Sequence, residues 1–164
     1  MPEQYPDIAI ALKQFSARVQ SYKLAAEYYA GNHRLLFATE KFRSAFGSLF
    51  RAFADNLCSK VVDAPANRLS ITGFSVEKGA EKLANEVWAL WLANRMDLRA
   101  GEVHTKALTA GDAYVIVWPD ANGQPIIYPN DAAMMTVRYD PETPGSISWA
   151  SKAWLGDDGK LRLN

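Results

Sequence analysis

The spacing of apolar residues changes near Gly111, and this change most constrains what the chain can fold into. Before it, apolar residues recur every three or four positions, which is the period of a helix. After it, they alternate or form short runs bounded by proline and glycine, as strands do. The sequence therefore predicts an α+β fold. We expect a mainly helical segment over 1–111, with a short strand near 68–74, and a β-rich segment over 112–164, the two forming one domain.

The first helix is expected from about Asp7 to Ala30, where Gly31 and Asn32 favour the left-handed conformation that closes a helix. Its apolar residues are spaced alternately four and three apart, as in a heptad seam. The seam consists of Ile8, Leu12, Phe15, Val19, Tyr22, Ala26 and Tyr29. A seam this narrow packs against one partner. We prefer the second helix of the same chain, with a neighbouring subunit as the alternative.

Three further helices are expected before the change in spacing. The second spans about 39–62 and is ended by Pro65. It carries phenylalanines on one face, which predicts a core element. The third spans about 77–93 and the fourth about 97–110, with Asp97 as the N-cap of the latter. So few residues separate these two helices that they must turn sharply against each other.

The β-rich segment predicts a series of short strands joined by tight turns. The strands fall at about 113–118, 125–128, 134–139, 147–155 and 160–164. Strands joined by tight turns pair antiparallel, so an antiparallel, meander-like sheet is expected. The sequence stops a few residues into the last strand, and we interpret this as the end of a fragment of a longer protein.

The charges balance, with 18 lysines and arginines against 18 aspartates and glutamates. A protein that grips DNA usually shows a basic excess, because its affinity comes from cations that displace counterions. A dedicated DNA-binding module is therefore not expected, although DNA could slide past such a surface. The single cysteine excludes an internal disulfide. The sequence shows no secretory signal and no apolar run long enough for a membrane, so a soluble cytoplasmic protein is expected.

Few residues are candidates for chemistry. His33 and His104 lack a second ligand at metal-binding spacing, and Cys58 beside the apolar face of its helix is interpreted as structural. Residues 157–159 lack the spacing of a calcium loop and are interpreted as a hairpin turn. The tryptophans are assigned to the core or a subunit interface: Trp88, Trp91, Trp118, Trp149 and Trp154. No catalytic, cofactor-binding or metal residue is predicted.

A series of short strings then occurs in a characteristic order. They are Tyr28–Asn32, Asn56–Cys58, Val61–Asp63, Arg68–Leu69, Gly73–Phe74, Trp88, Trp91–Asn94, His104, Ala110–Val117, Gly123–Ile126 and Tyr139–Thr143. In this order and spacing they resemble the N-terminal region of portal proteins of long-tailed bacteriophages, particularly those of actinobacterial phages and prophages. The resemblance covers nearly the whole chain. Each string alone is unspecific, and none is a catalytic signature.

The resemblance implies a structural protein without cofactors, not an enzyme. Portal proteins form a dodecameric ring at one vertex of the capsid, through which double-stranded DNA passes without sequence-specific binding. The implied partners are other copies of the chain, capsid proteins, the terminase and head–tail connector proteins, with no membrane. The implied location is the portal vertex of the virion, with assembly in the cytoplasm of the bacterial host. The N-terminal part of such proteins mainly builds the wing of the ring.

Functions of other classes are alternatives. A small-molecule-binding or regulatory α+β domain shares this order of elements, and a pocket with convergent polar groups would favour it. An enzyme would need a site that the sequence does not reveal. A helical DNA-binding module would need a basic recognition helix, but the fourth helix sets only Arg99 and Lys106 against Asp97 and Glu102.

Overall fold

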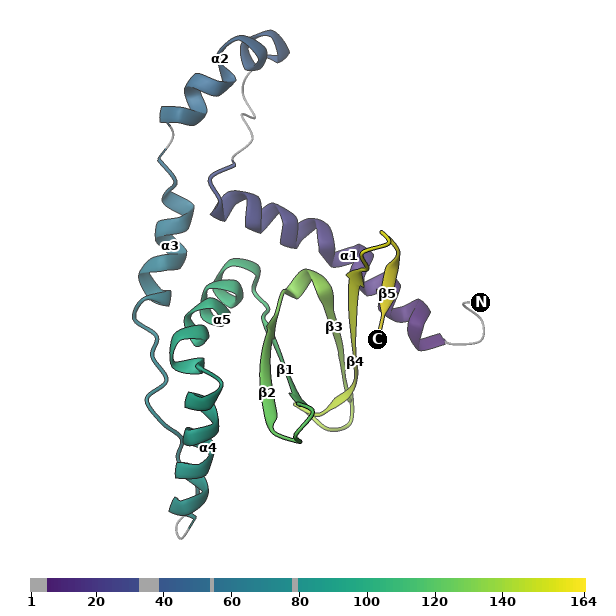
Figure 1. Ribbon diagram of the computed structural model, residues 1–164. Helices are drawn as coiled ribbons and strands as arrows, with labels where there is room; N and C mark the ends of the chain where they lie inside the picture. The colour runs from purple at the N-terminus through teal and green to yellow at the C-terminus, as the bar shows by residue number, and fades with distance from the viewer. Residues whose placement is uncertain (1–5, 33–38, 54, 78–79) are drawn as a thin grey trace.

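The computed structural model describes residues 6–32, 39–53, 55–77 and 80–164 (Figure 1). Helices occupy the first part of the chain and strands the second, so the α+β prediction is confirmed. The helices are α1 (Pro6–Tyr29), α2 (Glu40–Phe53), α3 (Leu57–Ala66), α4 (Glu81–Ala93) and α5 (Met96–Ala110). The strands are β1 (Tyr114–Pro119), β2 (Pro125–Asn130), β3 (Met135–Tyr139), β4 (Ile147–Leu155) and β5 (Leu161–Leu163), and a 3-10 turn, η2 (Ala132–Met134), joins β2 to β3.

The first helix agrees with the prediction within a residue at each end. It closes at Gly31 (φ 80°), where the Asn32 N–H donates to Glu27 O at 2.8 Å and the Gly31 N–H to Tyr28 O at 3.1 Å. This pair of bonds satisfies carbonyls that the end of a helix leaves open. α1 crosses above the strands in Figure 1, and it packs on α5, η2, α3 and β3.

The expected packing of the heptad seam is only partly right. α3 is the second half of the expected second helix and does contact α1, but α5 and η2 contact it more extensively. Ile8 and Leu12 of the seam are each 41% exposed. The most buried residue of the helix is instead Ala11, and Gln14 accepts a hydrogen bond from Thr136 of β3 at 2.6 Å. Contacts with β3 therefore place the buried side of α1 beside the seam at its N-terminal end, whereas four seam residues further along are half-buried: Phe15, Val19, Tyr22 and Tyr29.

The single helix expected over 39–62 is wrong, because α2 and α3 are separate helices. The reason lies at Asn56, whose side-chain oxygen accepts from the Ser59 N–H at 3.2 Å and so caps α3. The Asn56 amide also donates to Tyr29 O at 2.6 Å, which fixes the start of α3 to the end of α1. Pro65, expected to stop the helix, lies inside α3, which ends at Ala66, four residues beyond the predicted end.

The corner between α4 and α5 turns within two residues. Arg95 adopts a left-handed φ of 54°, alone among the described residues that are not glycine. α5 begins at Met96, so Asp97 lies in its first turn and is not its N-cap. The other end agrees with the prediction, because Gly111 stops α5 with φ 84°. α4 begins four residues later than predicted, at Glu81.

The strand expected near 68–74 is not formed. The chain there has no strand assignment, and residues 70–76 make no backbone hydrogen bond to any described residue. The sequence is strand-like, with Leu69, Ile71 and Phe74 at 51%, 37% and 39% exposure. A strand needs a partner, and none of the described strands pairs with this segment.

The strands pair antiparallel, as predicted, but in two sheets. β1 and β2 form a hairpin in which Val117 lies opposite Ile127. β3, β4 and β5 form a three-stranded meander, with an irregularity in register between Arg138 and Tyr139. The sheets are therefore small, and each relies on the helices for cover.

The buried core is small for a chain of this length. The buried apolar residues among those described are all alanines or methionines: Ala11, Ala66, Met96, Ala100, Ala132 and Met135. The accessible surface is 12571 Å² for 18.2 kDa, whereas a compact monomer of that mass exposes about 8,100 Å². Many large apolar side chains remain on the surface, among them Val61 (74% exposed), Leu155 (71%) and Trp118 (67%).

Candidate functional site

The residues considered for chemistry in the sequence lie apart in the structure. His104 is on α5, with its Nδ1 buried and without a hydrogen-bond partner, and Cys58 is half-buried on α3. Residues 157–159 form the turn between β4 and β5, with Gly159 at φ 72°. His33 lies outside the described residues. Within the described ranges, no three His, Cys, Asp or Glu side chains are grouped so that they could hold a metal ion.

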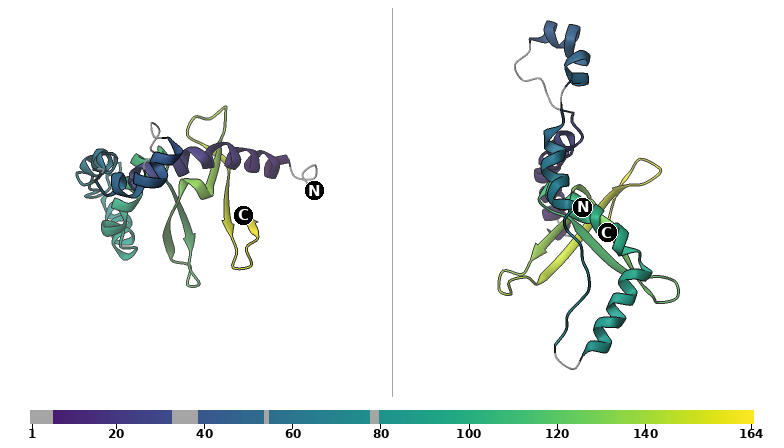
Figure 2. Two further views of the ribbon diagram at one scale, coloured as in Figure 1. Left: turned by 90° about the horizontal axis from the view of Figure 1, so that it is seen from above. Right: turned by 90° about the vertical axis from the view of Figure 1, so that its left-hand side faces the viewer.

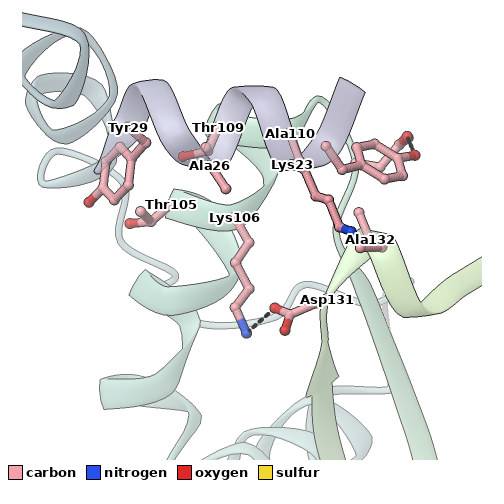
Figure 3. Close-up of a pocket in the computed structure, with 12 residues that line it drawn as sticks. Lys23, Ala26, Tyr29, Thr105, Lys106, Thr109, Ala110, Asp131 and Ala132 are labelled. Carbon is pink, nitrogen blue, oxygen red and sulfur yellow. Dashed lines mark hydrogen bonds and ion pairs between the residues drawn. The ribbon is translucent and has the colours of Figure 1, made fainter. Parts of the chain in front are cut away.

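A pocket of about 340 Å³ lies where α1, α5 and the η2 turn meet (Figure 3). α1 supplies Tyr22 and Tyr29, α5 supplies Thr105 and Lys106, and Asp131 comes from the start of the η2 turn. Its size falls in the range of small-molecule sites. Whether it can act as one depends on whether its polar groups are available to a ligand.

Lys106 is one of four charged residues that line this pocket, with Lys23, Asp112 and Asp131, and its ammonium is already paired. It lies 2.8 Å from an oxygen of Asp131 and 2.6 Å from one of Glu102, and Figure 3 shows it reaching down toward Asp131. Partial burial lowers the pKa of Lys106, but the hydrogen bonds and charges of Asp131 and Glu102 outweigh this, so that its pKa is raised. The positive charge therefore serves to join α5 to the η2 turn.

The phenols at the pocket are paired as well. The Tyr22 hydroxyl donates to Asp112 at 2.5 Å, and Arg18 lies 3.4 Å from the same carboxylate. Burial, with the hydrogen bond and charge of Asp112, raises the pKa of Tyr22 to about 12. The Tyr29 hydroxyl donates to Asp63 of α3 at 2.9 Å. These bonds connect α1 to α3 and to the end of α5, so they hold helices together rather than converge on a ligand.

A second feature is an apolar groove, bounded by residues 71–76, the α4–α5 corner and the β1–β2 hairpin. It consists of two adjoining cavities of about 340 and 200 Å³, which share Trp91, Val117 and Ile127. Phe74 packs edge-on against Trp91 at 5.5 Å and against Trp88 at 6.0 Å. The walls carry almost no polar surface, and Val117 is 59% exposed. The groove is therefore a candidate contact surface for another polypeptide.

The helix side of the β2 edge is already occupied by side chains. Asn94, which is 9% exposed, donates to Pro125 O at 3.0 Å and accepts from the Ile127 N–H at 2.9 Å. Arg99 donates to Ile127 O at 3.0 Å. The Asn94 amide thus takes the place of a neighbouring strand, which protects this edge from pairing with other chains. The sequence gives no local signal for this role, since it depends on β2 lying beside the corner.

The tryptophans, expected in the core or at a subunit interface, lie in different environments. Trp91 lies at the groove with its Nε1–H buried and without a partner, and the Nε1–H of Trp149 is in the same state. Trp118, at the end of β1, is largely exposed. Trp118 does not line the groove, because neighbouring residues of a strand point to opposite faces and Val117 faces the groove. Its exposure alone favours the interface assignment for this residue.

No described helix combines the length and apolar character needed to cross a membrane. Comparison with known proteins finds no matching curated protein and no matching solved structure. It does find a match to one family, described as phage portal protein, SPP1 Gp6-like, over residues 9–152. Since this match spans most of the 164 residues, the chain belongs to the SPP1 Gp6-like family of phage portal proteins.

Proposed function

We propose that this chain builds the wing of a portal ring, through which double-stranded DNA is packaged into the capsid and leaves it. Portal proteins are structural subunits of the virion that form oligomeric rings and work with capsid proteins and the terminase. The family match supports the role in general terms. The twelvefold ring, the passage of DNA, head–tail connector proteins as further partners and assembly in the host cytoplasm are parts of the proposal.

The observation that carries the proposal is the large exposed surface. The chain exposes 12571 Å², about 4,500 Å² more than a compact monomer of its mass. Burying apolar surface is the main favourable term in association, so side chains such as Trp118 and Leu155 favour contact with other polypeptides. A ring subunit needs two such faces, one for each neighbour.

The charge balance supports a place away from the DNA. The chain has a formal net charge of zero, and several of its cations are neutralised by acids, as Lys106 is by Glu102 and Asp131. A surface that lines a DNA channel closely would be more basic, because phosphate contacts come from lysine and arginine. The wing assignment, with residues 1–111 and 112–164 as parts of one domain, agrees with this distribution.

The alternative of a small-molecule-binding or regulatory domain is less well supported. It requires polar groups that converge on an open pocket. In the pocket between α1 and α5, Lys106, Tyr22 and Tyr29 are each bonded to a carboxylate of the same chain. The Thr109 hydroxyl at this pocket is buried without a partner, but a single hydroxyl does not make a convergent set.

The proposal can be tested in the phage or prophage that encodes the chain. A stop codon early in its coding region should leave heads that contain no DNA, and the intact gene supplied in trans should restore filled heads. Electron microscopy of thin sections and the amount of nuclease-protected DNA measure this. DNA-filled heads in the absence of the protein would contradict the proposed function.

A further inference from the structure

The helix α2 stands clear of the rest of the subunit. In Figure 1 it lies at the end opposite α4, beyond both sheets, and the right-hand view of Figure 2 agrees. None of the closely packed pairs of elements among the described residues includes α2. α2 has 14 residues, and helices shorter than about 12–15 residues are marginal in water without packing on an apolar face. This helix therefore needs a packing surface outside the compact part of its own subunit.

The described side chains of α2 show which face would pack. Phe42 and Phe46 lie one helical turn apart, with ring centroids 5.2 Å from each other. They are 42% and 46% exposed. Lys41 and Ser44 are exposed as well, but they lie on other sides of the helix. An amphipathic helix with aromatic residues on one side is a typical ligand of an apolar groove.

The same chain carries an apolar groove at its other end, lined by Trp91, Val117 and Ile127. The elements that line this groove, α4, α5 and the β1–β2 hairpin, lie far from α2 in Figure 1. When a patch and a complementary pocket lie at different places on one molecule, they produce a head-to-tail contact between copies. Such contacts close into a ring when the rotation that relates one subunit to the next is a whole fraction of a full turn.

We propose that α2 of one subunit packs its Phe42–Phe46 face into the Trp91–Val117 groove of the next copy of this chain. This inference rests on the proposed function, because a ring of identical subunits supplies the second copy. The area is sufficient for it. The excess surface of about 4,500 Å², shared between two faces, gives about 2,200 Å² on each and so about 4,400 Å² in total per interface, within the range of obligate interfaces.

Disulfide crosslinking between two single-cysteine chains tests the contact. Cys58→Ser removes the native thiol, and Ala45→Cys and Val117→Cys then place one thiol beside Phe46 and one in the groove. Ala45→Cys leaves both phenylalanines of α2 in place. An oxidised mixture of the two chains should give a dimer at twice the 18.2 kDa mass. Neither chain alone should give it, because the contact joins two different faces.

Matched variants show whether the aromatic face causes the crosslink. Phe46→Ser, added to the Ala45→Cys chain, should abolish the dimer, whereas Lys41→Ser should leave it unchanged. Glu142→Cys in the exposed turn after β3, used in place of Val117→Cys, should give no dimer. Circular dichroism of each variant checks that the fold is retained.

Other outcomes would overturn the inference. A dimer from the Ala45→Cys chain alone would show that two α2 helices pack on each other. If a chain carrying both Ala45→Cys and Val117→Cys forms only an intramolecular disulfide, α2 reaches the groove of its own subunit. Light scattering on the Cys58→Ser chain distinguishes failure of the α2–groove contact from failure of the proposed ring. If this chain associates but the cysteine pair gives no crosslink, only the α2–groove contact is refuted. Absence of both association and crosslink at every concentration refutes the contact and counts against the ring as well.

Discussion

Replacing Asn94 with alanine tests how the α4–α5 corner holds the β1–β2 hairpin. The Asn94 side chain makes three hydrogen bonds, to Leu90 O at 2.9 Å, to Pro125 O at 3.0 Å and from the Ile127 N–H at 2.9 Å. Each such bond contributes about 0.5–1.5 kcal/mol net. Asn94→Ala also leaves the Ile127 N–H without its partner in a partly buried place. We expect the free energy of unfolding to fall by about 2–4 kcal/mol.

Urea denaturation followed by tryptophan fluorescence measures this loss, since Trp91 lies in the groove beside the corner. The matched control is Asn122→Ala, in the exposed turn between β1 and β2, which should change stability by less than about 0.5 kcal/mol. Amide hydrogen exchange gives a second readout, because the Ile127 N–H should lose protection in Asn94→Ala. If both variants unfold at the same urea concentration, the corner does not hold the hairpin through Asn94 and this reasoning is refuted.

Two further predictions concern pH and the end of α1. The pKa of Tyr22 is raised from 10.0 to about 12, so its contribution to stability is complete below pH 10 and is lost as the pH rises toward 12. Circular dichroism should show steeper alkaline unfolding than in Tyr22→Phe, and identical curves would contradict the role of its bond to Asp112. Gly31 has φ 80°, and an added Cβ would lie 3.2 Å from Asn56 Nδ2. Gly31→Ala should therefore lower stability by about 1–2 kcal/mol, whereas Gly73→Ala, which has open space, should have little effect; equal thermal midpoints would contradict this.

The elements that the sequence predicts well are those fixed by local interactions. α1 and α5 appear within one residue of the expected bounds, because a repeating apolar pattern and a left-handed glycine, Gly31 or Gly111, define each of them locally. The strand β4 also has its predicted bounds, because a run of strand-forming residues between two tight turns defines a strand locally. The order of helices and strands follows from the change of spacing at Gly111.

Features that depend on distant contacts were not predictable. The break before α3 arises because Asn56 bonds to Tyr29 O, a contact across 27 positions of sequence. Residues 70–76 have a strand-like sequence but no strand beside them within the described chain. The apolar groove combines three separate segments, so neither its position nor the roles of Asn94 and Trp91 could be read from local spacing.

The central claim is that this chain is a ring-forming portal subunit, and the most direct measurement is electron microscopy of the purified protein encoded by the complete gene, with native mass spectrometry of the same sample. The account predicts closed rings of identical subunits, twelve by the proposal above, with a central opening wide enough for duplex DNA. Substitution of Phe46 by serine should leave fewer closed rings. A homogeneous monomer, or open filaments without closed rings under all conditions, would contradict the account.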